Sequence, residues 1–148
     1  MAPVLRRHFA GANQGHRTVV KVSIMEKMAT SRRPDPRRFL PLTHLAYHIL
    51  LSLAEAPAHG YALVQRIRER SEGLVDPGTG SFYSIIKKLS DDVLIAETET
   101  DDGDGRRRWY AITPLGQVVL VAEAERLTAQ LAATRKLGLA PSGRGGGR

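Results

Sequence analysis

The stretch from Asp76 to Leu89 constrains this chain more than any other. It opens with a turn, because Pro77 fixes φ, and Gly78 and Gly80 permit backbone shapes that other residues avoid. A helix is expected to begin just after this turn. Its apolar residues recur at i, i+3, i+4 and i+7, so they lie on one side of a 3.6-residue helix and face a core. These residues are Phe82, Ile85, Ile86 and Leu89.

The opposite side of this helix carries small hydroxyls, a phenol and two cations, with no carboxylate before Asp91. These residues are Ser81, Tyr83, Ser84, Lys87 and Lys88. Hydroxyls and a positive helix N-terminus suit phosphate oxygens, and lysine supplies charge, so the pattern is typical of a helix lying in a DNA groove. An ordinary amphipathic helix with a solvated lysine-rich face has the same pattern. The stretch alone leaves both interpretations open.

Composition narrows the function class. A chain of 148 residues with 42% hydrophobic content predicts one compact domain with a real core. The absence of cysteine excludes disulfides, thiolate metal sites and cysteine nucleophiles. No apolar run approaches the roughly 20 residues of a membrane span, so we expect a cytoplasmic protein. Without a phosphate loop or a cluster of carboxylates and histidines, we expect no enzyme and no cofactor.

The positive charge is unevenly distributed. The net charge is +7, but residues 1–40 hold nine bases and two acids, which accounts for the whole excess. From Pro41 to Gly138 the acids slightly outnumber the bases, so any DNA-binding cations there act locally. Residues 1–38, rich in Arg, Gly, Pro and Ser, are expected to form a disordered basic arm. Alternatively, Met25 or Met28 is the true start and part of this arm is not native.

Two helices are predicted before the opening stretch. The first lies between Thr43, a candidate N-cap, and Pro57. His44 and His48 lie one turn apart on it, but no third ligand completes a metal site, so surface histidines are favoured and no metal is expected.

A short link, residues 56–60, leads to the second helix, in which Tyr61, Val64 and Ile67 are predicted to face inward. Its outward residues are Arg66, Arg68 and Arg70. They could contact phosphates, although the nearby acids Glu69 and Glu72 favour a solvated surface. With the third helix, these elements predict a helix-turn-helix arrangement.

After Leu89 the period changes to two, which predicts a β-hairpin with strands at residues 94–100 and 106–112. Three successive arginines begin the second strand: Arg106, Arg107 and Arg108. They suit a wing that contacts the minor groove or flanking phosphates, although charge can also serve only to keep a hairpin edge soluble. The acidic loop at residues 101–105 lacks a bidentate Glu, so a turn is favoured over a calcium site.

Thr113 and Pro114 predict the start of a long helix that ends near Gly138. One apolar group, Leu115, Val118, Val119 and Ala122, can pack on its own domain. A second group follows heptad spacing and predicts dimerisation with a second copy. These residues are Leu120, Ala124, Leu127 and Leu131. The Gly-rich tail, residues 139–148, is expected to be disordered.

From Pro41 to about Leu137 the chain resembles the PadR family of bacterial transcription regulators. Five segments carry the resemblance: residues 49–53, His59-Gly60-Tyr61, Gly80 to Leu89, Leu94-Ile95, and Arg107 to Gly116. Two features depart from the family pattern. Val93 stands where the family usually has Gly, and Gly78-Thr79 could lengthen the turn before the third helix. The long N-terminal arm is not a usual family feature either.

The resemblance implies a mainly α fold with a small β-hairpin wing (α+β), in which a winged helix-turn-helix domain carries a long C-terminal dimerisation helix. It also implies ligand-modulated binding to a palindromic operator, usually with repression. The family's recognition-helix tyrosine falls on Tyr83 and its helix-two tyrosine on Tyr61, while its wing bases fall on Arg106, Arg107 and Arg108.

We therefore predict a homodimeric, DNA-binding transcription regulator, most simply an effector-responsive repressor that binds double-stranded DNA. The winged domain is placed at residues 39–112 and the dimerisation helix at 113–138. If a small aromatic or drug-like effector binds, an aromatic-lined cavity near the dimer helix is expected, with Tyr61 and Trp109 as candidates. The alternative is a winged helix that serves only as a protein-interaction module.

Overall fold

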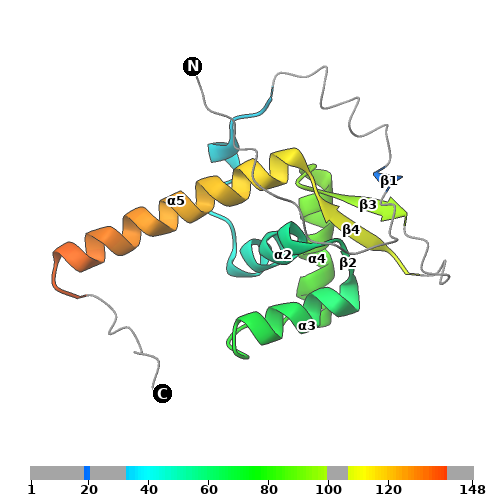
Figure 1. Cartoon of the computed structure of the whole chain (residues 1–148), viewed down its shortest axis with the longest axis horizontal. Coiled ribbons are helices and arrows are strands. Elements are labelled where there is room, and N and C mark those ends of the chain that lie inside the picture. The colour runs from blue at the N-terminus through cyan, green and yellow to red at the C-terminus, as the bar shows by residue number, and fades with distance from the viewer. Residues whose placement is uncertain (1–18, 21–32, 100–106, 140–148) are drawn as a thin grey trace.

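The computed structural model describes residues 19–20, 33–99 and 107–139, and it shows a mainly helical fold with a small antiparallel sheet (Figure 1). The helices are η1 (Pro36–Phe39), α2 (His44–Glu55), α3 (Gly60–Arg70), α4 (Thr79–Asp91) and α5 (Pro114–Lys136), of which η1 is a 3₁₀ turn. The strands are β1 (Val19–Val20), β2 (Ala58–His59), β3 (Ile95–Glu99) and β4 (Trp109–Ile112). This arrangement confirms the predicted winged helix-turn-helix class.

The core lies where α2, α3, α4 and the sheet meet. Ile49 and Leu50 of α2, Ile67 of α3 and Phe82 of α4 are all buried there. The predicted N-cap of α2 is confirmed, because Thr43 Oγ1 accepts a hydrogen bond from the Ala46 N–H at 3.2 Å. The apolar periodicity of α2 and α4 therefore predicted their buried faces correctly.

The predicted hairpin is confirmed, with Ile95 opposite Ile112 and Thr98 opposite Trp109. Two further strands extend it, so the sheet order is β1-β3-β4-β2. The link at residues 56–60 contains β2, whose Ala58 lies opposite Tyr110. A strand of two residues is too short to show a periodic pattern in the sequence, so β2 was not predicted.

Part of the predicted arm is also built into the fold. Val20 of β1 pairs with Thr98 of β3, and η1 lies against α5. The boundary predicted at residue 38 falls inside η1, so the packed chain begins before it. Residues 1–18 and 21–32 of the predicted arm, together with residues 140–148 of the predicted tail, lie outside the described residues.

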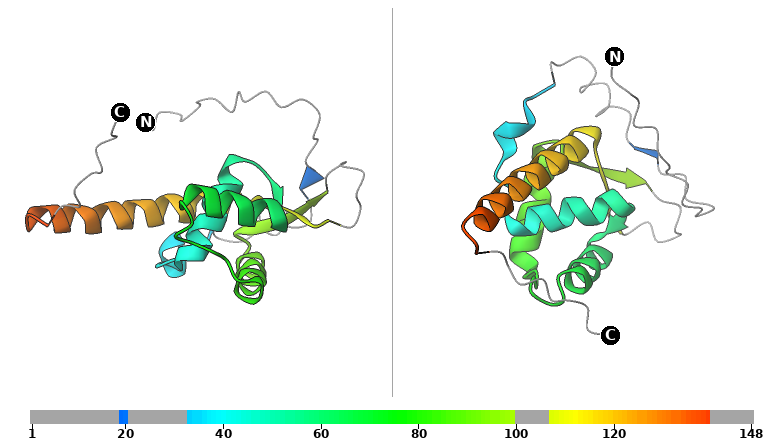
Figure 2. Two further views of the ribbon diagram at one scale, coloured as in Figure 1. Left: turned by 90° about the horizontal axis from the view of Figure 1, so that it is seen from below. Right: turned by 60° about the vertical axis from the view of Figure 1, so that its left-hand side comes forward.

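The long α5 extends well beyond the domain (Figure 2). Its predicted start is confirmed, since Thr113 caps it and Pro114 is its first residue. Val119 and Glu123 define its buried face. Val118 is 47% exposed, so the expectation that it packs on its own domain is wrong. It lies about 100° around the helix from Val119, which turns it away from the core.

The junction between α4 and β3 is a Schellman motif. The Leu94 N–H donates to the Leu89 carbonyl at 2.9 Å, and the Val93 N–H donates to the Ser90 carbonyl at 3.0 Å. Val93 has a φ of 59°, the left-handed conformation that this motif normally assigns to glycine. Val93 therefore occupies the position that glycine normally takes in this motif, and the turn still forms.

In the described ranges, no helix is long and apolar enough to cross a membrane.

Candidate nucleic-acid interface

The outer face of α4 presents all five predicted contact residues to solvent: Ser81, Tyr83, Ser84, Lys87 and Lys88. The helix begins at Thr79, so Thr79 and Gly80 belong to its first turn. Gly78 provides no side-chain cap for the N-terminus. The first N–H groups of an α-helix have no intrahelical partner, so this end of α4 suits an anion such as a phosphate.

The two lysines of α4 form matched ion pairs. Lys87 Nζ lies 2.6 Å from Asp91 Oδ2, and Lys88 Nζ lies 2.9 Å from Asp92 Oδ2. Both pairs join residues four apart on the helix surface, where such pairs contribute only about 0.3–0.5 kcal/mol. Either ammonium group can therefore exchange its carboxylate for a phosphate at small cost.

Tyr83 joins α4 to the start of α3. Its ring packs edge-on against Phe82, with centroids 5.4 Å apart. Its hydroxyl lies 3.5 Å from the point where a Cβ on Gly60 would stand. The pKa of Tyr110 on β4 is raised, chiefly by burial and then by Glu97, with a smaller contribution from Tyr83. Tyr83 of α4 therefore lies close to the start of α3 and near Tyr110 of the wing.

Tyr61 is 72% exposed, so the expectation that it faces inward is wrong. Leu63 and Ile67, one turn apart, define the buried face of α3. Tyr61 precedes Leu63 by two residues, which turns it about 200° around the helix axis. Its exposed phenol lies near the start of α3, the end against which Tyr83 packs.

The α3 arginines are engaged within the domain. Arg66 donates to the carbonyls of Ser52 and Ala56. Arg68 pairs with Asp76 at 2.7 Å, and Arg70 pairs with Glu55 and donates to Ser52 Oγ. These contacts favour a structural role for the three arginines. Their partners are not Glu69 and Glu72, the acids that the sequence suggested.

The wing presents exposed Arg107 and Arg108 just before β4, which begins at Trp109 and not at residue 106 as predicted. Arg108 lies 3.4 Å from Glu97 across the hairpin, a loose and exposed ion pair. Arg106 lies outside the described residues. β3 of the wing packs against α4.

The two effector candidates lie on either side of His59. The His59 ring stacks on Tyr61 at 6.5 Å and meets Trp109 edge-on at 5.0 Å. Because Tyr61 is exposed, the rings of Tyr61, His59 and Trp109 form an open aromatic surface. Two grooves elsewhere in the described chain are lined by other residues.

The predicted dimerisation residues of α5, which we call its seam, differ in their exposure to solvent. Leu120 packs partly against the domain's own core, whereas Leu127 and Leu131 remain 39% and 36% exposed. Beside this seam Glu123 is buried, and Arg126 holds both of its carboxylate oxygens at 2.7 Å. This pairing holds the pKa of Glu123 below its usual value. A glutamate buried in an apolar face gave no signal in the sequence.

Within the described ranges, no three side chains that could bind a metal ion lie close together. His44 and His48 stack with centroids 4.9 Å apart. The pKa of His48 is lowered, first by burial and then by the nearby His44 and Arg70.

A sequence model of the transcriptional regulator PadR-like family matches residues 49–122, half of the chain. The chain belongs to the PadR-like family. The match covers the second half of α2 through the first part of α5, and so includes α4 and the described wing arginines.

A curated relative of this PadR-like chain is an uncharacterized 37.1 kDa protein in transposon Tn4556 of Streptomyces fradiae, which is 33% identical over 79 residues. The matched stretch is 53% of this chain and 21% of that longer protein. The chain therefore spans about a fifth of the relative it matches.

Solved structures share the PadR-like fold. A transcriptional regulator from Clostridium thermocellum matches with a TM-score of 0.55 and 23% identity, over 68% of this chain and 93% of that one. A PadR family regulator from Clostridium difficile R20291 matches with a TM-score of 0.54 and 23% identity, over 64% and 98% of the two chains. RosR of H. salinarum gives a TM-score of 0.52 and 23% identity, over 64% and 82%.

Proposed function

We propose that this PadR-like regulator binds operator DNA as a homodimer and represses transcription, with α4 as its recognition helix and the hairpin as its wing. One observation carries the proposal. The apolar side of α4 is buried in the core, while its five hydroxyl, phenol and ammonium residues are exposed, as are Arg107 and Arg108 of the wing. Those groups match phosphate and base-edge recognition.

Within this surface, the proposed roles follow from position. Ser84 and Lys87 lie on the side of α4 opposite the core, where they would enter the groove most deeply. Tyr83 and Tyr61 lie beside the start of α3 and would contact the phosphate backbone. Arg107 and Arg108 would hold flanking phosphates, and we extend this role to Arg106.

The seam of α5 supports the dimer. Leu127 and Leu131 lie in the second half of α5, and both keep apolar surface exposed. Two copies related by a two-fold axis would present their α4 helices to half-sites about one helical turn apart, which implies a palindromic operator. A small-molecule effector that changes this binding completes the proposed regulation.

DNA binding is tested by fluorescence anisotropy on a duplex selected from a random library. Lys87→Gln should weaken binding and reduce the slope of log K against log salt by about 0.9, the loss of one phosphate contact. Arg135→Gln is the matched control, because it removes one exposed cation near the end of α5. Equal effects of the two substitutions would contradict the assignment of α4.

The dimer is tested separately by light scattering. Leu127→Glu together with Leu131→Glu should convert the dimer to a monomer, because each places a charge in the apolar seam. Glu125→Gln is the control on the same helix. Specific duplex binding by a monomer of the doubly substituted chain, at wild-type affinity, would refute the two-fold arrangement.

The protein-interaction alternative makes an opposite prediction. A winged helix that contacts only proteins would select no sequence from the duplex library and would show the same weak affinity for any DNA.

A further inference from the structure

The short strand β1 lies at the outer edge of the wing and adds a fourth strand to its sheet (Figure 1). It pairs antiparallel with β3, so that Val19 lies opposite Glu99 and Val20 lies opposite Thr98. The other three strands fall within residues 49–122, the region that matches the PadR-like family, whereas β1 precedes that region. The fourth strand is therefore an addition that the matched region does not supply.

This added strand covers the edge of the wing. Without β1, β3 would present a row of backbone N–H and C=O groups to any extended chain. One register joins all four strands, from Val20 through Thr98 and Trp109 to His59. Thr98 has a strand on each side and is only 7% exposed. Sheets commonly bind extended peptides by such strand addition, and here the peptide is the chain's own N-terminal segment.

The register also fixes the direction in which β1 runs. Val19 lies opposite Glu99, the last residue of β3, so the N-terminal end of β1 is at the end of β3 that enters the hairpin loop. Arg108 is at the same end of the sheet, because it immediately precedes Trp109, which lies opposite Thr98. The chain that leads into β1 is therefore anchored at the end of the wing that carries its arginines.

The sequence before β1 is basic. Residues 1–18 contain three arginines and no aspartate or glutamate. Arg17 is two residues from Val19, and two residues of chain span at most about 7 Å. The pairing of β1 with β3 thus restricts Arg17 to the vicinity of the wing, whereas Arg6 and Arg7 are much further back in the chain. A guanidinium group in this position suits a DNA phosphate.

We propose that β1 recruits the N-terminal segment to the wing, and that Arg17 binds a DNA phosphate next to those contacted by Arg107 and Arg108. Arg17 adds one phosphate contact, which increases affinity and reads no sequence. The phosphate contact rests on the proposed DNA-binding function, whereas the pairing of β1 with β3 does not.

The first experiment tests the strand in the full chain without DNA. The chain has no cysteine, so an engineered pair of cysteines is free of background. Val19→Cys with Glu99→Cys places two thiols opposite each other, where the Cα atoms of an antiparallel pair are about 4.5–5.5 Å apart and a disulfide can form. The control is Val19→Cys with Glu97→Cys, a diagonal pair about 7–8 Å apart.

Mild oxidation should crosslink the opposite pair and leave the diagonal pair reduced. Mass spectrometry of the digested chain identifies the disulfide. Equal crosslinking of the two pairs, or none in either, would overturn the assignment of β1 to the wing edge.

The second experiment measures binding to the selected duplex at several salt concentrations. Arg17→Gln should reduce the slope of log K against log salt by about 0.9, the loss of one phosphate contact. Val19→Pro with Val20→Pro keeps every charge and removes both N–H groups of β1, so it should reduce the slope by the same amount. Arg135→Gln again serves as the control for loss of an exposed cation.

Combining the substitutions tests whether Arg17 acts through β1. In the proline variant, Arg17→Gln should have no further effect, because Arg17 is already released from the wing. A further reduction of about 0.9 would show that Arg17 binds as part of a free basic arm, and would overturn the role of β1. An unchanged slope for Arg17→Gln alone would overturn the phosphate contact.

The outcomes separate this inference from the proposed function. Specific crosslinking with no duplex binding would refute the proposed function, and with it the Arg17 contact, but not the four-stranded wing. A slope that responds to Lys87→Gln and not to Arg17→Gln would refute the Arg17 contact alone.

Discussion

Thr113 and Val93 are joined by a hydrogen bond in which the Thr113 hydroxyl donates to the Val93 carbonyl at 2.7 Å. The same oxygen accepts from the Gly116 N–H at 3.0 Å, which caps α5. One buried hydroxyl therefore connects the end of α4 to the start of α5. This contact holds the start of α5 against the turn that follows α4.

Thr113→Val should lower the free energy of unfolding by about 2 kcal/mol. The substitution keeps the shape, removes the cap and leaves buried polar backbone groups without a partner. Urea denaturation followed by circular dichroism measures the change. Thr128→Val is the control, because Thr128 only donates to the Ala124 carbonyl on the exposed part of α5. A loss in the control as large as at Thr113 would contradict the explanation.

Val93→Gly should raise the free energy of unfolding by about 1 kcal/mol. A β-branched residue at a φ of 59° is strained, and glycine adopts this conformation without a Cβ clash. Val93→Ala should recover less, since alanine keeps its Cβ. A glycine variant less stable than wild type would show that the Val93 side chain contributes more through packing than its backbone conformation costs.

Gly116→Ala should destabilise the domain by at least about 2 kcal/mol. A Cβ on Gly116 would meet the Leu94 carbonyl oxygen at 2.1 Å and Ile112 Cγ1 at 2.8 Å, so the start of α5 would be displaced. Gly80→Ala is the matched substitution in the first turn of α4, where nothing lies within 4 Å of the added atom. It should be neutral or stabilising by up to about 1 kcal/mol. Thermal melts of both variants distinguish crowding from helix propensity.

His48 should make stability depend on pH below neutrality. Its pKa in the folded chain is lowered by burial, by His44 and by Arg70, so the unfolded chain binds the proton more readily. Stability is then fully present above the ordinary histidine pKa of about 6.5 and falls as pH drops below it. Urea denaturation at several pH values should show this fall.

His48→Gln tests the assignment because it removes the titrating group. The fall in stability below about pH 6.5 should become shallower in this variant. An unchanged slope would assign the pH dependence to other groups.

Residues close in sequence determined much of this fold. The spacing of Phe82, Ile86 and Leu89 indicated the buried side of α4, and Thr113 with Pro114 marked the start of α5. These signals could be read from the sequence because helix periodicity and capping depend on residues within one or two turns. They also placed the five exposed residues of α4 on one face, so the proposed DNA surface follows from local pattern.

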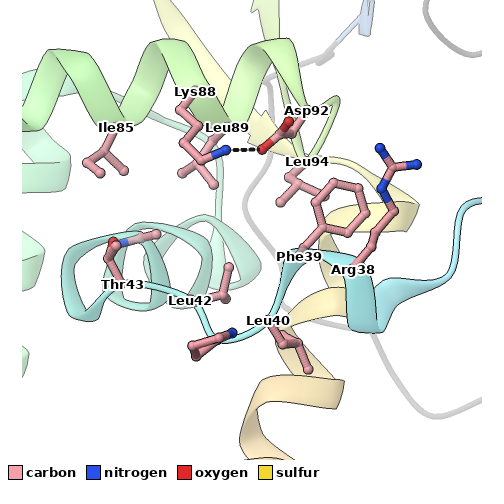
Figure 3. Close-up of a pocket in the computed structure, with 12 residues that line it drawn as sticks. Arg38, Phe39, Leu40, Leu42, Thr43, Ile85, Lys88, Leu89, Asp92 and Leu94 are labelled. Carbon is pink, nitrogen blue, oxygen red and sulfur yellow. Dashed lines mark hydrogen bonds and ion pairs between the residues drawn. The ribbon is translucent and has the colours of Figure 1, made fainter.

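Contacts between distant segments decided the rest. Tyr61 faces outward because packing at Leu63 and Ile67 set the rotation of α3, and the α3 arginines found partners in α2 and at Asp76. Two residues at Ala58–His59 became a strand only because β4 lies beside them. The groove lined by Phe39, Leu42 and Ile85 brings together residues that are more than 40 positions apart in the chain (Figure 3). Sequence fixes which faces are apolar, whereas the relative placement of elements depends on packing among residues far apart in the chain.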